Sequence, residues 1–126
     1  MKTKINIGIR IFFGAALVAV GADKFLEFIP HGHEMTESLI NAFTGLIANR
    51  FILPTVGIVE LLTGASLLLN KFTNLSLLAM VPVSYGIVAF HLAVDIPGVV
   101  LGIIVALLNA YLLLQKRGEL SVLLRP

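Results

Sequence analysis

Four long apolar runs decide what this chain of 126 residues can fold into. They lie at about residues 5–28, 51–69, 75–94 and 97–114. A run of about 20 apolar residues is long enough to cross the ~30 Å hydrocarbon core of a bilayer as an α-helix. The sequence therefore predicts an all-α integral membrane protein, a bundle of four transmembrane helices.

The composition excludes most other classes of protein. Hydrophobic residues make up 58% of the chain and charged residues 13%, whereas a typical soluble domain has about 25% charged residues. This is too little polar surface for a soluble fold, and the apolar content excludes a disordered chain. The absence of cysteine excludes disulfide and thiol chemistry. The bases are scattered between the apolar runs, so we expect a lipid bilayer and no nucleic acid as partner.

The distribution of basic residues predicts how the chain is oriented. With a cytoplasmic N-terminus, the outer side carries only two bases, Lys24 and Arg50. The cytoplasmic side then carries Lys2, Lys4, Arg10, Lys71, Lys116, Arg117 and Arg125. By the positive-inside rule both termini are cytoplasmic, and we expect the membrane to be a bacterial cytoplasmic membrane.

The segment 34–49, between the first two spans, has a different pattern. Its apolar side chains recur on one helical face: Met35, Leu39, Phe43, Leu46 and Ile47. This spacing predicts a short amphipathic helix at the outer membrane surface. Such a helix either connects two spans and shields the bundle, or it covers a cavity that opens outward.

Small residues predict where the helices meet, because helices in lipid associate through close packing of their backbones. Gly57 and Gly64 share one face of the second span. In the fourth span, Gly98, Gly102 and Ala106 recur at intervals of four residues. We expect this second face to pack in the bundle or to dock a membrane protein partner or a second copy of the chain.

Ionisable residues at membrane depth are the strongest candidates for a site. Glu60 lies midway along the second span, where an ionised carboxylate costs several kcal/mol, so it must face another helix and be paired or protonated. Ser84, His91 and Asp95 follow one another at i, i+7 and i+11. This spacing predicts a polar stripe that rises along the third span toward the outer surface.

The first span ends at the same outer level with two further charged residues. The candidate ligand-binding residues are therefore Asp23, Lys24, Glu60, Ser84, His91 and Asp95. Three roles are compatible with this cluster. Ion pairs of Glu60 with Lys24 or His91 join helices; or a pocket binds a quinone or another lipid-like ligand through a carbonyl oxygen; or the cluster conducts protons or ions.

Other chemistries find little support in the sequence. His31, His33 and Glu34 have the residue types of a metal site, but a polar loop of this kind is more often simply solvated, so we predict no metal. Only His91 lies in a span, whereas a bis-histidine haem needs two facing histidines. No phosphate-binding loop or catalytic triad is found, so we assign no catalytic residue and no covalently bound cofactor.

Three motifs give the chain a resemblance to a known family. They are Arg10-x3-Gly14-x6-Gly21-x2-Lys24, then Gly57-x2-Glu60-Leu61-x2-Gly64, and finally His91 late in the third span. With these motifs the chain resembles the DoxX family of small four-helix membrane proteins over nearly its whole length, as a single domain of residues 1–126. The resemblance implies a buried glutamate in the second helix, with a cavity near it.

The resemblance also implies two kinds of function. Some relatives are subunits of quinone-linked membrane oxidoreductases, so we expect an accessory subunit that binds a quinone or lipid and is not an enzyme on its own. In that role Glu60 is the buried acid, Lys24 its counter-charge and His91 a hydrogen-bond donor to the ligand. A distant eukaryotic branch resembles assembly chaperones of ligand-gated channels. The alternative is therefore a membrane-protein assembly partner that docks through Gly98, Gly102 and Ala106.

Overall fold

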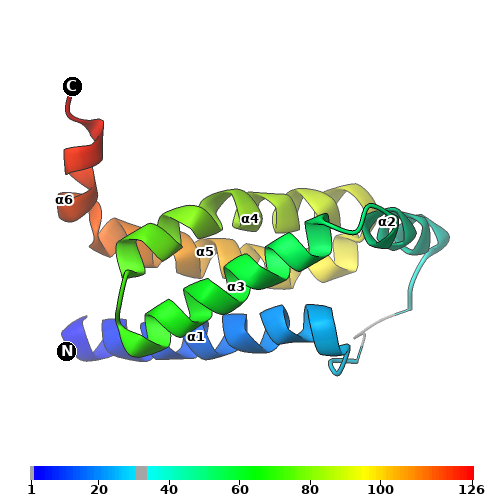
Figure 1. The fold of residues 1–126 in the computed structure, drawn as a ribbon, viewed down its shortest axis with the longest axis horizontal. Helices are drawn as coiled ribbons and strands as arrows, with labels where there is room; N and C mark the ends of the chain where they lie inside the picture. Colours follow the sequence, from blue (N-terminus) through cyan, green and yellow to red (C-terminus); the bar gives the residue numbers. More distant parts are fainter. Residues whose placement is uncertain (1, 31–33) are drawn as a thin grey trace.

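The computed structural model describes residues 2–30 and 34–126, and every regular element in them is helical (Figure 1). The elements are α1 (Lys2–Leu26), α2 (Glu37–Ala48), α3 (Ile52–Leu69), α4 (Thr73–Val94), η1 (Ile96–Gly98), α5 (Val99–Gln115), α6 (Arg117–Leu120) and η2 (Ser121–Leu124). The predicted all-α class is confirmed.

Four of the described helices are long and apolar enough to cross a membrane. These spans are Thr3–Leu26, Ile52–Leu69, Thr73–Val94 and Ile96–Gln115. Many large apolar side chains on them point outward and are more than half exposed, as lipid-facing side chains are. The prediction of four transmembrane helices is therefore confirmed, and each predicted boundary lies within three residues of the observed one.

The bundle consists of two helix pairs. α1 packs most extensively against α3, α4 packs against α5, and the contact of α3 with α4 joins the pairs. Both termini lie at one end of the bundle, which we call the terminal end (Figure 1). α2 lies at the opposite end, which we call the α2 end. The fully buried apolar core lies toward the terminal end and contains Phe13, Leu17, Leu67, Leu77, Met80 and Leu112.

Glycine sets the distance between α1 and α3, as the small-residue pattern predicts. A Cβ atom on Gly64 would lie 2.7 Å from the carbonyl oxygen of Gly14. A Cβ atom on Gly21 would lie 3.0 Å from the carbonyl oxygen of Gly57. Any side chain at these two crossings would push the helices apart, so four glycines fix the closest approach in the bundle.

The end of α1 differs slightly from the predicted boundary at residue 28. The helix ends at Leu26 because Glu27 adopts a left-handed backbone conformation, with a φ of 50°. The carboxylate of Asp23 accepts a hydrogen bond of 2.7 Å from the backbone N–H of Ile29. Asp23 thus stabilises the turn that ends the helix.

The predicted amphipathic helix is present as α2. The hydroxyl of Thr36 accepts a hydrogen bond of 3.2 Å from the N–H of Leu39, which is a typical N-terminal cap. Leu39 is buried, and the ring of Phe43 lies edge-on to Phe90 of α4, with the ring centroids 5.5 Å apart. These contacts fix α2 on the bundle through its apolar face. Its position at a membrane surface stays a prediction.

The central glycine of the small-residue face of the fourth span is turned into the bundle. Docking of a partner through this face stays a prediction. Gly102 is buried, and a Cβ atom there would lie 3.1 Å from Cγ2 of Ile87. Gly98 lies directly beside the side chains of His91 and Asp95. Gly102 thus lies at the contact between α4 and α5.

Candidate functional site

An ion pair joins α1 to α3 in the half of the bundle toward the α2 end. Nζ of Lys24 lies 2.7 Å from Oε2 of Glu60, whose side chain is 1% exposed, whereas that of Lys24 is 22% exposed. Apart from this ion pair, Oε2 has no hydrogen-bond partner among the described residues. The ammonium group also donates a hydrogen bond of 3.4 Å to the Val20 carbonyl.

The helix geometry explains why these two side chains meet. Helical side chains lean toward the N-terminus of their own helix, and α1 and α3 run in opposite directions (Figure 1). Lys24 lies three residues after Gly21, and Glu60 lies three residues after Gly57. Because those two glycines form a close crossing, both side chains lean back toward it and meet there.

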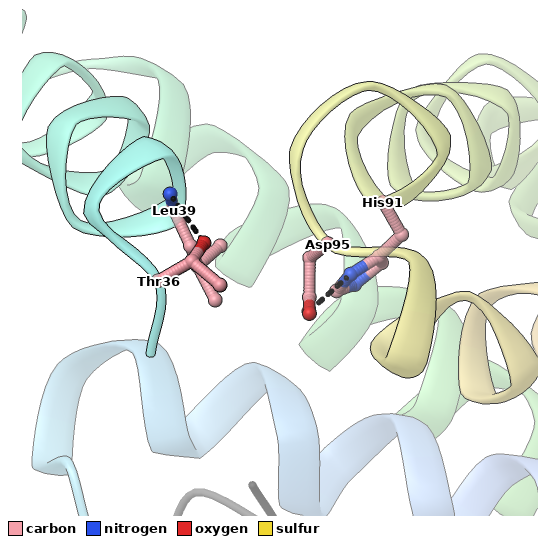
Figure 2. Close-up of polar contacts among 4 residues, drawn as sticks. All are labelled: Thr36, Leu39, His91 and Asp95. Atoms are coloured by element: carbon pink, nitrogen blue, oxygen red, sulfur yellow. Dashed lines mark hydrogen bonds and ion pairs between the residues drawn. The ribbon is translucent and has the colours of Figure 1, made fainter. Parts of the chain in front are cut away.

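A second polar pair lies at the end of α4. Nδ1 of His91 lies 2.9 Å from Oδ2 of Asp95, one helical turn later (Figure 2). Asp95 is buried, whereas His91 is partly exposed. The backbone N–H of Gly98 donates to the carbonyl of Asp95 at 3.0 Å. A Cβ atom on Gly98 would lie 2.8 Å from Nδ1 of His91, so the turn after α4 accommodates the pair only with glycine there.

The first turn of α2 belongs to the same end of the bundle as this second pair. Figure 2 shows Thr36, the N-terminal cap of α2, and Leu39 in its first turn together with His91 and Asp95. The ring of Phe90 contacts Phe43 of α2. It also lies edge-on to the imidazole of His91, with the ring centroids 5.6 Å apart. α2 therefore contacts α4 immediately next to the histidine.

The structure separates the six predicted site residues into two pairs and two single residues. Within residues 2–30 and 34–126, no ion pair links Lys24 and Glu60 to His91 and Asp95. Asp23 binds the turn after α1. Ser84 is buried in α4, and its hydroxyl has no hydrogen-bond partner in the described part of the chain.

Polar contacts at the terminal end are the features that sequence reasoning missed. The hydroxyl of Tyr111 donates to the side-chain oxygen of Asn6 at 2.6 Å, and the amide of Asn6 donates to Gln115 at 3.4 Å. Arg10 donates to the backbone carbonyl of Leu67. Tyr111 and Gln115 are four residues apart, which is a usable signal for one helical face, but nothing in the sequence pairs either with Asn6.

Two cavities, each of about 440 Å³, also lie at the terminal end. The first is lined by Tyr111, Leu114, Gln115 and Arg117. The second is lined by Leu78, Ala110, Leu113, Leu114, Arg117, Leu120, Ser121 and Leu124. None of the six predicted site residues lines either cavity.

The described residues contain no group of three or more histidine, aspartate or glutamate side chains placed to hold a metal ion. His31 and His33, which we considered as metal ligands, lie outside the described residues. Glu34, the third member of that motif, is exposed. Among the described residues, the α2 end offers a buried carboxylate paired with an ammonium group, and an imidazole–carboxylate pair.

Comparison with known proteins gives the family. No curated protein and no solved structure gives a significant match to the chain. The sequence profile of the DoxX family matches residues 6–93, which run from α1 almost to the end of α4. The match includes Lys24, Glu60, Ser84 and His91. Since it covers more than half of the chain, this membrane protein belongs to the DoxX family.

Proposed function

We propose that this protein is an accessory subunit of a membrane redox system that binds a quinone-like ligand, or another lipid-like ligand, at the α2 end. The observation that carries the proposal is the Lys24–Glu60 pair, with its carboxylate buried and its ammonium group partly exposed. A buried ion pair is a weak source of stability, because desolvation offsets the attraction between the charges. Ionisable residues at membrane depth are more often explained by function.

Lys24 is the group of the pair that has room to contact a ligand. Its ammonium group carries three protons, and the ion pair with Glu60 and the hydrogen bond to Val20 use two of them. The third is free to donate to a quinone carbonyl oxygen. Glu60 is a positioning residue in this proposal, because it holds the ammonium group at the α1–α3 crossing.

His91 contributes a second hydrogen-bonding group whose role depends on its protonation. Nδ1 faces the carboxylate of Asp95 and therefore carries a proton. In the neutral ring Nε2 then accepts a hydrogen bond, as from the hydroxyl of a quinol. The donor role that the sequence analysis expected for His91 requires the imidazolium form, which suits the carbonyl of a quinone.

The titration of a short-chain benzoquinone into the purified protein in detergent tests this proposal. We expect the Lys24→Gln and His91→Ala variants to bind about tenfold more weakly or worse, as the loss of a hydrogen bond to a charged group implies. Glu119→Gln is the matched control, since Glu119 is an exposed acid at the other end of the bundle. If both variants bind like the control, the site assignment is wrong.

We further propose that both termini face the cytoplasm of a bacterium. The bias of basic residues toward the terminal end supports this orientation. The natural chain has no cysteine, so single cysteines placed at Lys71 and Arg50 report one side each. Labelling of intact cells with an impermeant thiol reagent is expected to modify position 50 and not position 71, and the opposite result would reverse the orientation.

The alternative role as an assembly partner has less support from the geometry. It was expected to use the Gly98, Gly102 and Ala106 face, and Gly102 is buried against α4. Docking through that face would require α4 and α5 to separate. A partner that cross-links to the intact bundle and is lost in Gly102→Leu, with the helix content unchanged, would restore this alternative.

A further inference from the structure

The two cavities at the terminal end share a wall and differ in chemistry. Leu114 and Arg117 line both. The first cavity also has a phenol and an amide in its lining, from Tyr111 and Gln115. The second is aliphatic apart from Arg117 and Ser121. Both cavities are open at the surface, since Leu114 is 62% exposed and Leu124 is 87% exposed.

The C-terminal segment of residues 117–124, formed by α6 and η2, builds one wall of the aliphatic cavity. It turns away from the bundle after α5 (Figure 1) and places Leu120 and Leu124 on a cavity that Leu78 of α4 also lines. Glu119 fixes this segment, since it accepts a hydrogen bond of 2.5 Å from Asn74 at the start of α4. The aliphatic cavity is therefore a groove between α4, α5 and the C-terminal segment, and the Asn74–Glu119 hydrogen bond connects that segment to α4.

Charge at this end favours an anionic occupant. The terminal end holds the basic residues Lys4, Arg10, Lys71, Lys116, Arg117 and Arg125. Glu119 is its one acid among the described residues, and Glu119 is engaged by Asn74 and Lys116. Arg117 forms no ion pair with any described residue. Arg117 is an exposed residue that lines both cavities, and its charge has no ion-pair partner in the described part of the chain.

We propose that this groove binds an anionic phospholipid, with the phosphate on Arg117 and an acyl chain between Leu78, Leu113 and Leu120. An arginine fork is suited to bidentate contact with phosphate oxygens. The polar cavity beside it receives the rest of the headgroup, where Tyr111 and Gln115 supply hydrogen bonds. The site lies at the opposite end of the bundle from Lys24 and Glu60, and only Leu78 of its lining falls within residues 6–93.

Native mass spectrometry with added phosphatidylglycerol tests the phosphate contact. We expect Arg117→Gln to reduce the bound lipid about tenfold, as the loss of a charged hydrogen bond implies. Arg125 lies eight residues after Arg117 and lines neither cavity. Arg125→Gln therefore removes the same charge and is expected to leave binding unchanged. Phosphatidylcholine with the same acyl chains is expected to bind more weakly than phosphatidylglycerol. Equal losses in the two arginine variants would mean unspecific attraction to a basic surface and would overturn the proposal.

A second pair of variants tests the acyl-chain contact. Leu120→Gln is expected to weaken phosphatidylglycerol binding, whereas Leu123→Gln, at an exposed position outside the groove, is not. Glycerol phosphate, which lacks acyl chains, is expected to bind far more weakly than the lipid. If glycerol phosphate binds as tightly, the site is a phosphate site and the lipid proposal is wrong. Quinone binding is expected to be normal in Arg117→Gln, so the two proposals fail separately.

Discussion

Lys24 and Glu60 form the central contact of this protein, and they differ in exposure. This difference predicts how much each residue contributes to the free energy of unfolding. The side chain of Glu60 is 1% exposed, whereas that of Lys24 is 22% exposed. Removing one partner of a buried ion pair costs about 3–5 kcal/mol, because the other charge stays buried. The long lysine side chain escapes most of this cost, because it extends toward the membrane surface when it is freed.

We therefore expect Lys24→Met to lower the free energy of unfolding more than Glu60→Gln does. The double variant is expected to recover part of the loss, since it leaves no unpaired charge. Chemical unfolding in detergent, followed by circular dichroism, measures all three values. Equal losses in the two single variants, or a larger loss in Glu60→Gln, would contradict the burial of Glu60 that we describe.

Asp23 is a charged residue that the sequence places in the candidate ligand site, but in the structure it stabilises the turn after α1. From the sequence it belongs with Lys24 at the outer level, and the structure uses its carboxylate to bind the N–H of Ile29. Hydrophobic periodicity predicts which face a residue is on. It does not predict whether a carboxylate near a helix end binds a ligand or the local backbone, because that depends on the conformation of the next few residues.

At the scale of elements, the approach of α1 to α3 depends on glycine. Gly64→Ala places a methyl group 2.7 Å from the Gly14 carbonyl, so we expect a loss of about 1–3 kcal/mol in the free energy of unfolding. Gly86→Ala in α4 is the matched control, because no atom lies within 4 Å of the new methyl group. That variant is expected to be neutral or to stabilise by up to about 1 kcal/mol.

Thermal unfolding of the two glycine variants in the same detergent checks this prediction. The Gly64 variant is also expected to weaken the Lys24–Glu60 pair, which depends on the same helix approach. If both substitutions had the same small effect, the close crossing of α1 and α3 would be wrong.

The C-terminal segment is held by a contact that depends on pH. The hydrogen bond from Asn74, and next the charge of Lys116, lower the pKa of Glu119 below its usual value. The contact therefore stabilises the segment fully above the ordinary carboxylate pKa of about 4.3, and this contribution is lost as the pH falls through the lowered value. We expect the segment to stay attached at pH 7 and to become less firmly attached as the pH falls through this lowered pKa.

The distance between spin labels on the segment and on α4, measured from pH 7 to pH 3, checks this expectation. In Glu119→Gln the distance is expected to be independent of pH over this range. A segment that moves equally in the variant and in the natural chain would show that some other group controls it.

At the scale of the whole molecule, the sequence predicted the spans because their length and apolar character are set by the bilayer. The spacing of Gly57 and Gly64 predicted that this face meets another helix, but it did not indicate that this helix is α1. The contact between Asn6 and Tyr111 was not predictable, because it joins residues that are 105 positions apart. The helical structure of the C-terminal segment, residues 117–124, was not predicted. Its leucines Leu120, Leu123 and Leu124 form too short an apolar run to indicate a helix.

The candidate site was predictable only in part, for a physical reason. Glu60 is recognisable as costly wherever it lies in the span, so its need for a partner follows from the sequence alone. Which residues share a pocket depends on how the helices rotate and cross. The structure thus pairs Lys24 with Glu60 and His91 with Asp95, a division that the single polar cluster of the sequence analysis did not contain.

The central claim is that the Lys24–Glu60 pair serves a ligand as well as the fold. Native mass spectrometry of the protein purified gently from its own membranes tests it most directly. We predict a retained molecule of quinone or isoprenoid mass in the natural protein and in Glu119→Gln, lost in Glu60→Gln and in Lys24→Gln. A ligand-free mass for the natural protein, or the same bound molecule in all four proteins, would contradict the claim and leave the pair a purely structural contact.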